Sequence, residues 1–218
     1  MHYFYAMDNP VMILGAGHIA RLAREVFESN GNVVYGFLDD DKSLHGTTID
    51  DISVLGATDD DGFLKLIGKK CEAFVAVDDT RLRKSLVKLL NDVRHVQPVN
   101  AVHPRAGVSS RAAIGHGNLV DASVEVAPGA VVGNHCLIHA LVVLGVGVQC
   151  GDHVQIGAGS VINAGVVIAD EAFIGSGVTV VSGVTLGKGC RIGAGSVVVA
   201  DVKPGETVFG NPAKTVSL

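Results

Sequence analysis

The feature that most constrains this sequence is a six-residue repeat that runs from Val102 to Val199 without an insertion. Every sixth residue is aliphatic, with Cys150 as the exception, and a small or β-branched residue usually stands four positions later. Gly often follows the aliphatic residue directly. The aliphatic column consists of Val102, Val108, Ile114, Val120, Val126, Val132, Ile138, Leu144, Cys150, Ile156, Ile162, Ile168, Ile174, Val180, Leu186, Ile192 and Val198. This period indicates a hexapeptide parallel β-helix.

The period has a physical explanation. Each unit supplies one short strand and one tight turn, so three units close a triangular coil that buries its apolar column by stacking on the next coil, about 4.8 Å away. An α-helix would require apolar spacings of three and four. A sandwich of unrelated short strands would not hold one phase for so long. We therefore predict a β-helix domain with a C-terminal tail over residues 101–218.

The N-terminal part has a different pattern. Val11–Leu14 reads as a buried strand, followed by the glycine turn Gly15-Ala-Gly17 and an amphipathic helix at Arg21–Ser29. A strand, a glycine turn and a helix are typical of nucleotide-binding βαβ units, in which the backbone approaches a phosphate at the helix N-terminus. A second strand, Val33–Leu38, ends in three consecutive Asp residues.

These acids suggest where a ligand would bind. Asp39 and Asp40 stand at the distance where such units place an acid on a nucleoside, although a solvated loop is the alternative. Further strands are predicted at Glu72–Val77 and Val96–Asn100, with a helix at Arg81–Asn91 between them. Residues 1–100 are thus expected to form a small Rossmann-like αβ domain with its ligand near Gly15, Asp39 and Asp78.

Composition excludes several classes of function. The formal net charge of -5 provides no basic face for nucleic acid or anionic lipid. The sequence contains no apolar run long enough for a membrane span, and its first ten residues lack the pattern of a signal peptide. A cytoplasmic protein is therefore expected. The four cysteines have neither metal-binding nor disulfide spacing, so no metal site is predicted.

Several motifs together resemble one protein family. They are Gly15-Ala-Gly17, the Gly-Phe-Leu-Asp-Asp run at Gly36–Asp40, Val102-His-Pro104, the repeat, and Gly210-Asn-Pro-Ala-Lys214. In this order they resemble the bacterial sugar acetyltransferases of the sialic-acid and bacillosamine pathway type. They span nearly the whole chain, and their order is more specific than any single motif.

The resemblance implies a left-handed β-helix, a homotrimer, and acetyl-CoA-dependent acetylation of an amino group or hydroxyl of a nucleotide-linked sugar in surface-glycan biosynthesis. Acetyl-CoA, the co-substrate, would lie in a groove between neighbouring β-helices. The residues implied to contact the nucleotide sugar are Gly15, Gly17, Asp39 and Asp40. Those implied to contact CoA are Gly157, Gly175, Gly193 and Lys214.

The sequence departs from the family at the catalytic position. The family's general base is a histidine, but the corresponding position here is Val146, and a second family histidine falls on Gln155. Neither side chain accepts a proton at neutral pH, so both remain candidate substrate contacts only. One alternative is a catalytically impaired trimeric protein that binds or senses ligands. Another is an acetyltransferase for a small acceptor, which the αβ domain argues against.

Four histidines of the repeat could in principle replace the missing catalytic base. His139 occupies the glycine column one coil before Gly157, so it is a candidate catalytic base or a polar substrate contact. His135 and His153 stand 18 residues apart and should stack on adjacent coils. They could hold a metal or share a proton, but two ligands do not make a site, so an exposed turn pair is favoured. His116 is expected to be a surface residue.

Overall fold

The computed structural model describes residues 9–216, and the chain divides into two compact units between Pro104 and Arg105. Residues 1–8, on which much of the signal-peptide prediction rests, lie outside the described residues. Within residues 9–216, every helix is too short or too polar to cross a bilayer. The two units are described separately below.

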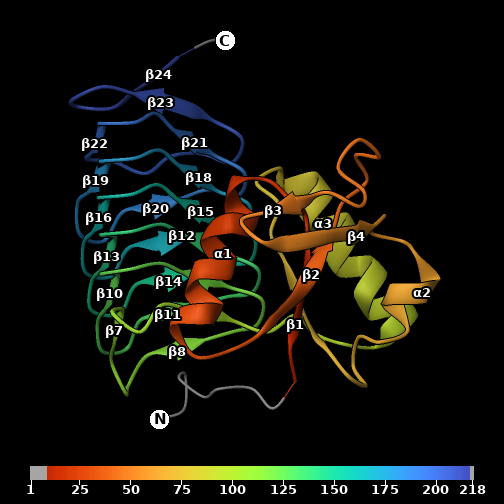
Figure 1. The fold of residues 1–218 in the computed structure, drawn as a ribbon. Helices are drawn as coiled ribbons and strands as arrows, with labels where there is room; N and C mark the ends of the chain where they lie inside the picture. The colour runs from red at the N-terminus through yellow and green to blue at the C-terminus, as the bar shows by residue number, and fades with distance from the viewer. Residues whose placement is uncertain (1–8, 217–218) are drawn as a thin grey trace. The chain divides into compact units, whose positions relative to one another are not determined.

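The first unit is built on a five-stranded sheet in the order β3-β4-β2-β1-β5. Strands β3, β4, β2 and β1 are labelled in Figure 1. Its strands are β1 (Val11–Leu14), β2 (Val34–Leu38), β3 (Thr48–Ile49), β4 (Ile52–Gly56) and β5 (Glu72–Val75). All neighbours pair in parallel except β3 and β4. The helices are α1 (His18–Ser29), α2 (Asp61–Leu64), α3 (Thr80–Leu89) and the π-helical turn η1 (Leu90–Arg94).

Alternation along β1 determines which helix covers each face of the sheet. Met12 and Leu14 point to one face, where they pack with Leu86 of α3 and Leu90 of η1. Helix α1 buries one apolar stripe, and its Phe27 ring meets the ring of Phe74 edge to face at 5.5 Å. These contacts fix the C-terminal ends of β1, β2 and β5 at a common edge.

The structure differs from the sequence prediction at three places in this unit: one predicted strand does not form, and neither the β3–β4 hairpin nor α2 was predicted. Residues Val96–Asn100 do not form a strand; Val99 donates one backbone hydrogen bond to Ala73, and Pro98 has no N–H for a ladder. The β3–β4 hairpin was missed, although its two-residue turn, Asp50-Asp51, carries the positive φ angles of 48° and 70° that tight hairpins require.

The second unit is a parallel β-helix of two-residue strands. They are β7 (Gly107–Val108), β8 (Ala113–Ile114), β9 (Leu119–Val120), β10 (Glu125–Val126), β11 (Val131–Val132), β12 (Leu137–Ile138), β13 (Val143–Leu144), β14 (Gln149–Cys150), β15 (Gln155–Ile156), β16 (Val161–Ile162), β17 (Val167–Ile168), β18 (Phe173–Ile174), β19 (Thr179–Val180), β20 (Thr185–Leu186), β21 (Arg191–Ile192) and β22 (Val197–Val198). The preceding strand of the repeat, β6 (Ala101–Val102), falls in the first unit.

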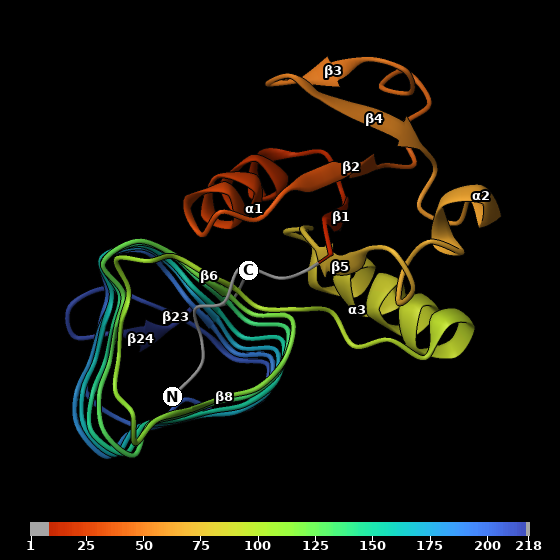
Figure 2. The same ribbon diagram turned by 60° about the horizontal axis from the view of Figure 1, so that its bottom comes forward.

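Three flat sheets form the walls of the β-helix, which appears triangular when viewed along its axis (Figure 2). Sheet I is β22-β19-β16-β13-β10-β7, sheet II is β20-β17-β14-β11-β8, and sheet III includes β21-β18-β15-β12-β9. Each strand pairs in register with the strand 18 residues away, as Val143 does with Val161. The aliphatic column is buried except at Val108 and Ile114, which are half-buried. The repeat prediction is therefore confirmed.

The tail closes one end of sheet III. Strand β23 (Thr207–Phe209) pairs in parallel with β21, and β24 (Lys214–Thr215) folds back antiparallel onto β23. The added strands supply partners to backbone groups that would otherwise form an open sheet edge.

Candidate functional site

A cavity of about 200 Å³ opens at the C-terminal edge of the first unit's sheet. Its lining comes from the loop and helix start after β1, the end of β2, and the loop after β5. The lining residues are Gly15, Ala16, Gly17, His18, Ile19, Asp39, Ala76, Val77, Asp78 and Leu82. Gly15, Asp39 and Asp78 thus lie together at the C-terminal ends of the strands, as expected for a parallel sheet.

The two glycines of the turn serve different purposes. Gly15 has φ +106°, and a Cβ there would lie 2.6 Å from the Ala76 carbonyl oxygen, so the fold itself requires glycine. Gly17 has ordinary φ, and a Cβ there would meet nothing within 4 Å. Its missing side chain therefore leaves open space at the cavity.

The first two acids after β2, Asp39 and Asp40, also differ in their surroundings. The Asp39 carboxylate lines the cavity and accepts hydrogen bonds from the N–H groups of Ala16 (2.8 Å) and Asp41 (2.9 Å). Asp40 does not line the cavity: its carboxylate accepts from the Thr58 N–H and hydroxyl at 2.9 and 2.7 Å. The structure thus gives Asp40 a structural bond in place of the substrate contact expected of it.

The third acid, Asp41, also belongs to the loop. Ser43 donates to its carboxylate from both the hydroxyl (2.7 Å) and the backbone N–H (2.9 Å). These hydrogen bonds lower the pKa of Asp41. The Asp run is therefore an ordered loop rather than a simply solvated one.

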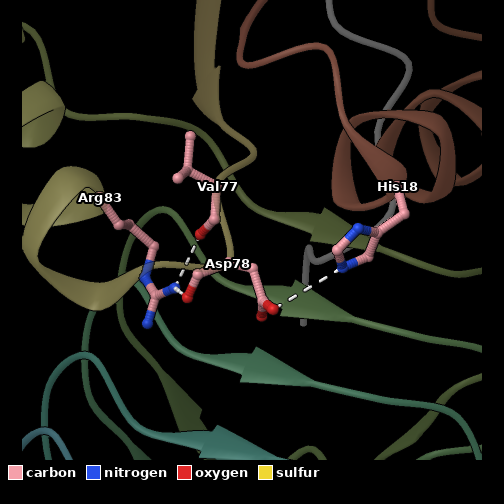
Figure 3. Close-up of polar contacts among 4 residues, drawn as sticks. All are labelled: His18, Val77, Asp78 and Arg83. Atoms are coloured by element: carbon pink, nitrogen blue, oxygen red, sulfur yellow. Dashed lines mark hydrogen bonds and ion pairs between the residues drawn. The ribbon is translucent and has the colours of Figure 1, made fainter.

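A polar cluster that the sequence analysis did not identify lies beside Gly17 (Figure 3). His18, the first residue of α1, places Nε2 3.7 Å from the Asp78 carboxylate. Arg83, only 1% exposed, donates from Nη1 to the backbone carbonyls of Val77 (2.8 Å) and Asp78 (3.1 Å). The available sequence signal for this support was that Arg83 shares one face of the helix with Leu86 and Val87.

In the β-helix, the glycine column has a structural cause. A Cβ on Gly157 or Gly175 would lie 2.4 or 2.6 Å from a backbone nitrogen of the next coil, and one on Gly193 would lie 1.8 Å from the Phe209 ring. In this register the stacking therefore leaves no room for a Cβ at these three positions, whether or not a ligand lies beside them, and Phe209 covers Gly193. Lys214, on β24, is exposed.

The three positions tied to catalysis lie on different parts of the prism. His139 follows β12, at the turn from sheet III to sheet I, and Gln155 occupies the outward position of β15 on sheet III. Val146, 59% exposed, lies at the following turn, from sheet I to sheet II. Within one copy of the chain, His139 and Val146 therefore lie at different corners.

Two neighbours of His139 were missed. Asp121 precedes it by one coil in the same column; its N–H donates to the Ile138 carbonyl at 3.0 Å, and the residue is buried. Leu141 has φ +63° and is 63% exposed, a strained position for a bulky apolar side chain. The turn that carries His139 thus combines a buried acid with an exposed leucine.

The other three histidines named from the sequence lie in different environments. His135 and His153 stack with ring centroids 5.0 Å apart, and His135 is buried, so the exposed pair favoured from sequence is wrong. His116 is exposed, as expected. In the part of the chain that the structure describes, no three His, Cys, Asp or Glu side chains lie close enough to hold a metal ion.

All four cysteines are buried free thiols. A hydrogen bond with Cys136, together with burial, raises the pKa of Cys150, and burial raises the pKa of Cys190 to about 11. Because the thiolate is the reactive form, we expect none of the four to react within minutes with an aromatic disulfide reagent at pH 8. All four should react in denaturant, whereas rapid labelling of any native thiol would contradict the burial.

Comparisons with known proteins agree with this architecture. Residues 10–90 match the PglD N-terminal domain family, and residues 147–182 and 170–200 match the bacterial transferase hexapeptide family (six repeats). A comparison with curated proteins found no match.

Solved structures match over nearly the full length. A histidine-to-asparagine variant of perosamine N-acetyltransferase from Caulobacter crescentus, solved with CoA and GDP-perosamine, is 30% identical over 97% of this chain and 98% of that chain, with a TM-score of 0.89. The acetyltransferase domain of PglB from Neisseria gonorrhoeae FA1090 is 28% identical over 96% and 100% of the two chains, with a TM-score of 0.88. WeeI from Acinetobacter baumannii AYE, at 24% identity and a TM-score of 0.79, shares the fold over 95% and 99%.

A small αβ domain with a ligand-sized cavity, followed by a left-handed hexapeptide β-helix, defines a class of bacterial transferases. The 30% identity to the perosamine N-acetyltransferase, over nearly the full length of both chains, identifies the family within this class. The chain belongs to the family of hexapeptide-repeat sugar acetyltransferases that carry a PglD-type N-terminal domain.

Proposed function

We propose that this chain is a cytoplasmic, homotrimeric enzyme that transfers acetyl from acetyl-CoA to an amino group of a nucleotide-linked sugar in surface-glycan biosynthesis. The observation that carries the proposal is the full-length match, spanning both units, to a perosamine N-acetyltransferase solved with CoA and GDP-perosamine. The N-terminal cavity supports a nucleotide in the first unit, at Gly15, Gly17 and Asp39.

The reaction requires the amine nitrogen to attack the thioester carbonyl. A C–N bond forms, the C–S bond breaks, CoA leaves as the thiol, and the nitrogen loses one proton. Acetyl-CoA is proposed to bind near the turns of Gly157 and Gly175, with Lys214 as an exposed cation for its phosphates. Gly193 is the weakest member of this set, because Phe209 covers it.

A second candidate function is a trimer that binds both ligands without turnover. It is favoured by Val146 and Gln155, because neither side chain can accept the proton that the amine releases. Hydroxyl acceptors are disfavoured on the same ground, since a sugar hydroxyl needs a base more than a neutral amine does.

One assay separates these two functions. Thiol release from acetyl-CoA is followed with UDP- and GDP-linked amino sugars, and the buried cysteines should contribute no background. Turnover with at least one sugar supports the enzyme. Calorimetric binding of both ligands without thiol release supports the non-catalytic trimer, and binding of neither would refute both.

Trimerisation is an expected result. Outward-facing Val131, Val143 and Val167 are exposed on the flat sheets I and II of a single chain, a surface that tends to aggregate unless another copy covers it. Light scattering at micromolar concentration should give three times the 22.5 kDa chain mass. A monomer would contradict the prediction and remove any groove between copies.

Asp39 and Asp40 should differ when each is changed. Asp39→Ala should weaken nucleotide binding and leave acetyl-CoA binding intact, because its carboxylate lines the cavity. Asp40→Ala should instead lower the free energy of unfolding by about 1–3 kcal/mol, because Thr58 is buried and loses its acceptor. Calorimetry and urea unfolding measure the two effects, and equal effects of both changes on binding would refute the distinction.

A further inference from the structure

His18 and Asp78 both line the cavity of the first unit, one from the start of α1 and the other from the loop after β5 (Figure 3). Their side chains approach to 3.7 Å while remaining 77% and 49% exposed. Ion pairs this exposed contribute only about 0–1 kcal/mol. A ligand that binds either side chain more strongly can therefore break the pair with little loss of free energy.

The surroundings of His18 favour an anion. Helix α1 begins after Gly17 with no side-chain cap and no acidic residue in its first turn. The N-terminal N–H groups and the positive end of the helix dipole therefore attract negative charge. The Asp78 carboxylate supplies one negative charge 3.7 Å from the His18 ring.

Asp78 is fixed close to this point by its backbone. Buried Arg83 binds the carbonyls of Val77 and Asp78, so the loop cannot easily withdraw. The neighbouring acids have backbone donors of their own: Asp39 accepts from Ala16 and Asp41, and Asp79 accepts from the Leu82 N–H at 2.8 Å as the cap of α3. Asp78 is thus the carboxylate paired with His18.

We propose that the His18–Asp78 pair is an anion switch: Asp78 holds the imidazole in the ligand-free protein, and the diphosphate of the nucleotide replaces it. The inference rests on the proposed function, since it needs a nucleotide in the cavity. It makes Asp78 a specificity-determining residue, which lowers affinity for the diphosphate without affecting the nucleoside and so favours release of the nucleotide-sugar product.

The test compares charged and uncharged ligands. Calorimetry on the full chain measures GDP against guanosine and UDP against uridine. Removing one negative charge several ångströms from a diphosphate should strengthen its binding about three- to tenfold at moderate salt, so Asp78→Asn should do this for GDP or UDP. Binding of the matching nucleoside should stay unchanged.

Asp79→Asn is the matched control. It removes the same charge one residue away, outside the cavity lining, and Asn caps a helix as well as Asp does. It should leave diphosphate binding unchanged. In a double-mutant cycle, His18→Gln should reduce the gain from Asp78→Asn, because the competition for the imidazole is then absent.

The outcomes are distinguishable. Equal changes in nucleoside and diphosphate binding would mean that Asp78 contacts the nucleoside, and equal gains from Asp78→Asn and Asp79→Asn would mean a general charge effect; either overturns the switch. So would strict additivity in the cycle. If acetyl-CoA binds but no nucleotide binds any variant, the nucleotide part of the proposed function fails as well. Thermal unfolding checks that each variant folds.

Discussion

Replacing Val146 with His and Gly147 with Asp is expected to raise turnover about 10- to 100-fold, which is up to the lower limit of what a well-positioned general base contributes. Val146 is 59% exposed, so an imidazole there would reach solvent or a neighbouring copy rather than the core. Gly147 has φ +69° with nothing near its absent Cβ, and Asp tolerates this backbone region better than most residues.

Gly147→Asp alone is the control for backbone strain and should not raise the rate. The measurement is thiol release with the nucleotide sugar that shows the highest wild-type activity. No gain in the double variant, with acetyl-CoA and nucleotide sugar still bound, would show that Val146 is not where a missing base belongs.

Turnover should fall at least about 100-fold in His139→Ala if His139 has taken over as the base. The supporting observation is its place at the turn between sheets III and I, one coil after buried Asp121. Thiol release from acetyl-CoA measures the effect, with the same nucleotide sugar for wild type and variant.

Two variants sharpen this test. His139→Asn keeps a polar side chain, so retained activity would make His139 a substrate contact rather than a base. His116→Ala removes an exposed histidine from another turn of the β-helix and should change nothing. A loss below about threefold in His139→Ala would assign the residue a structural role, since general-base contributions are far larger.

Periodicity in the sequence determined the β-helix. One aliphatic column with a period of six is compatible with few folds, because only stacking at a spacing of 18 residues buries every member, and the observed register is that spacing. The glycine turn and the acids after β2 likewise located the cavity, since parallel strands bring their C-terminal ends to one edge.

Only the tertiary structure decided what individual residues do. Asp39 and Asp40 are adjacent and chemically identical, yet only Asp39 lines the cavity, because Thr58, 18 residues further along the chain, binds Asp40. The 18-residue spacing places Gly193 in the same column as Gly157 and Gly175, but only the folded chain brings Phe209 against it. His18 and Asp78 stand 60 positions apart in the sequence. They meet because β1 and β5, the strands that precede them, are neighbours in the sheet. A linear pattern specifies which elements form, whereas side-chain partners depend on distances that only the folded chain creates.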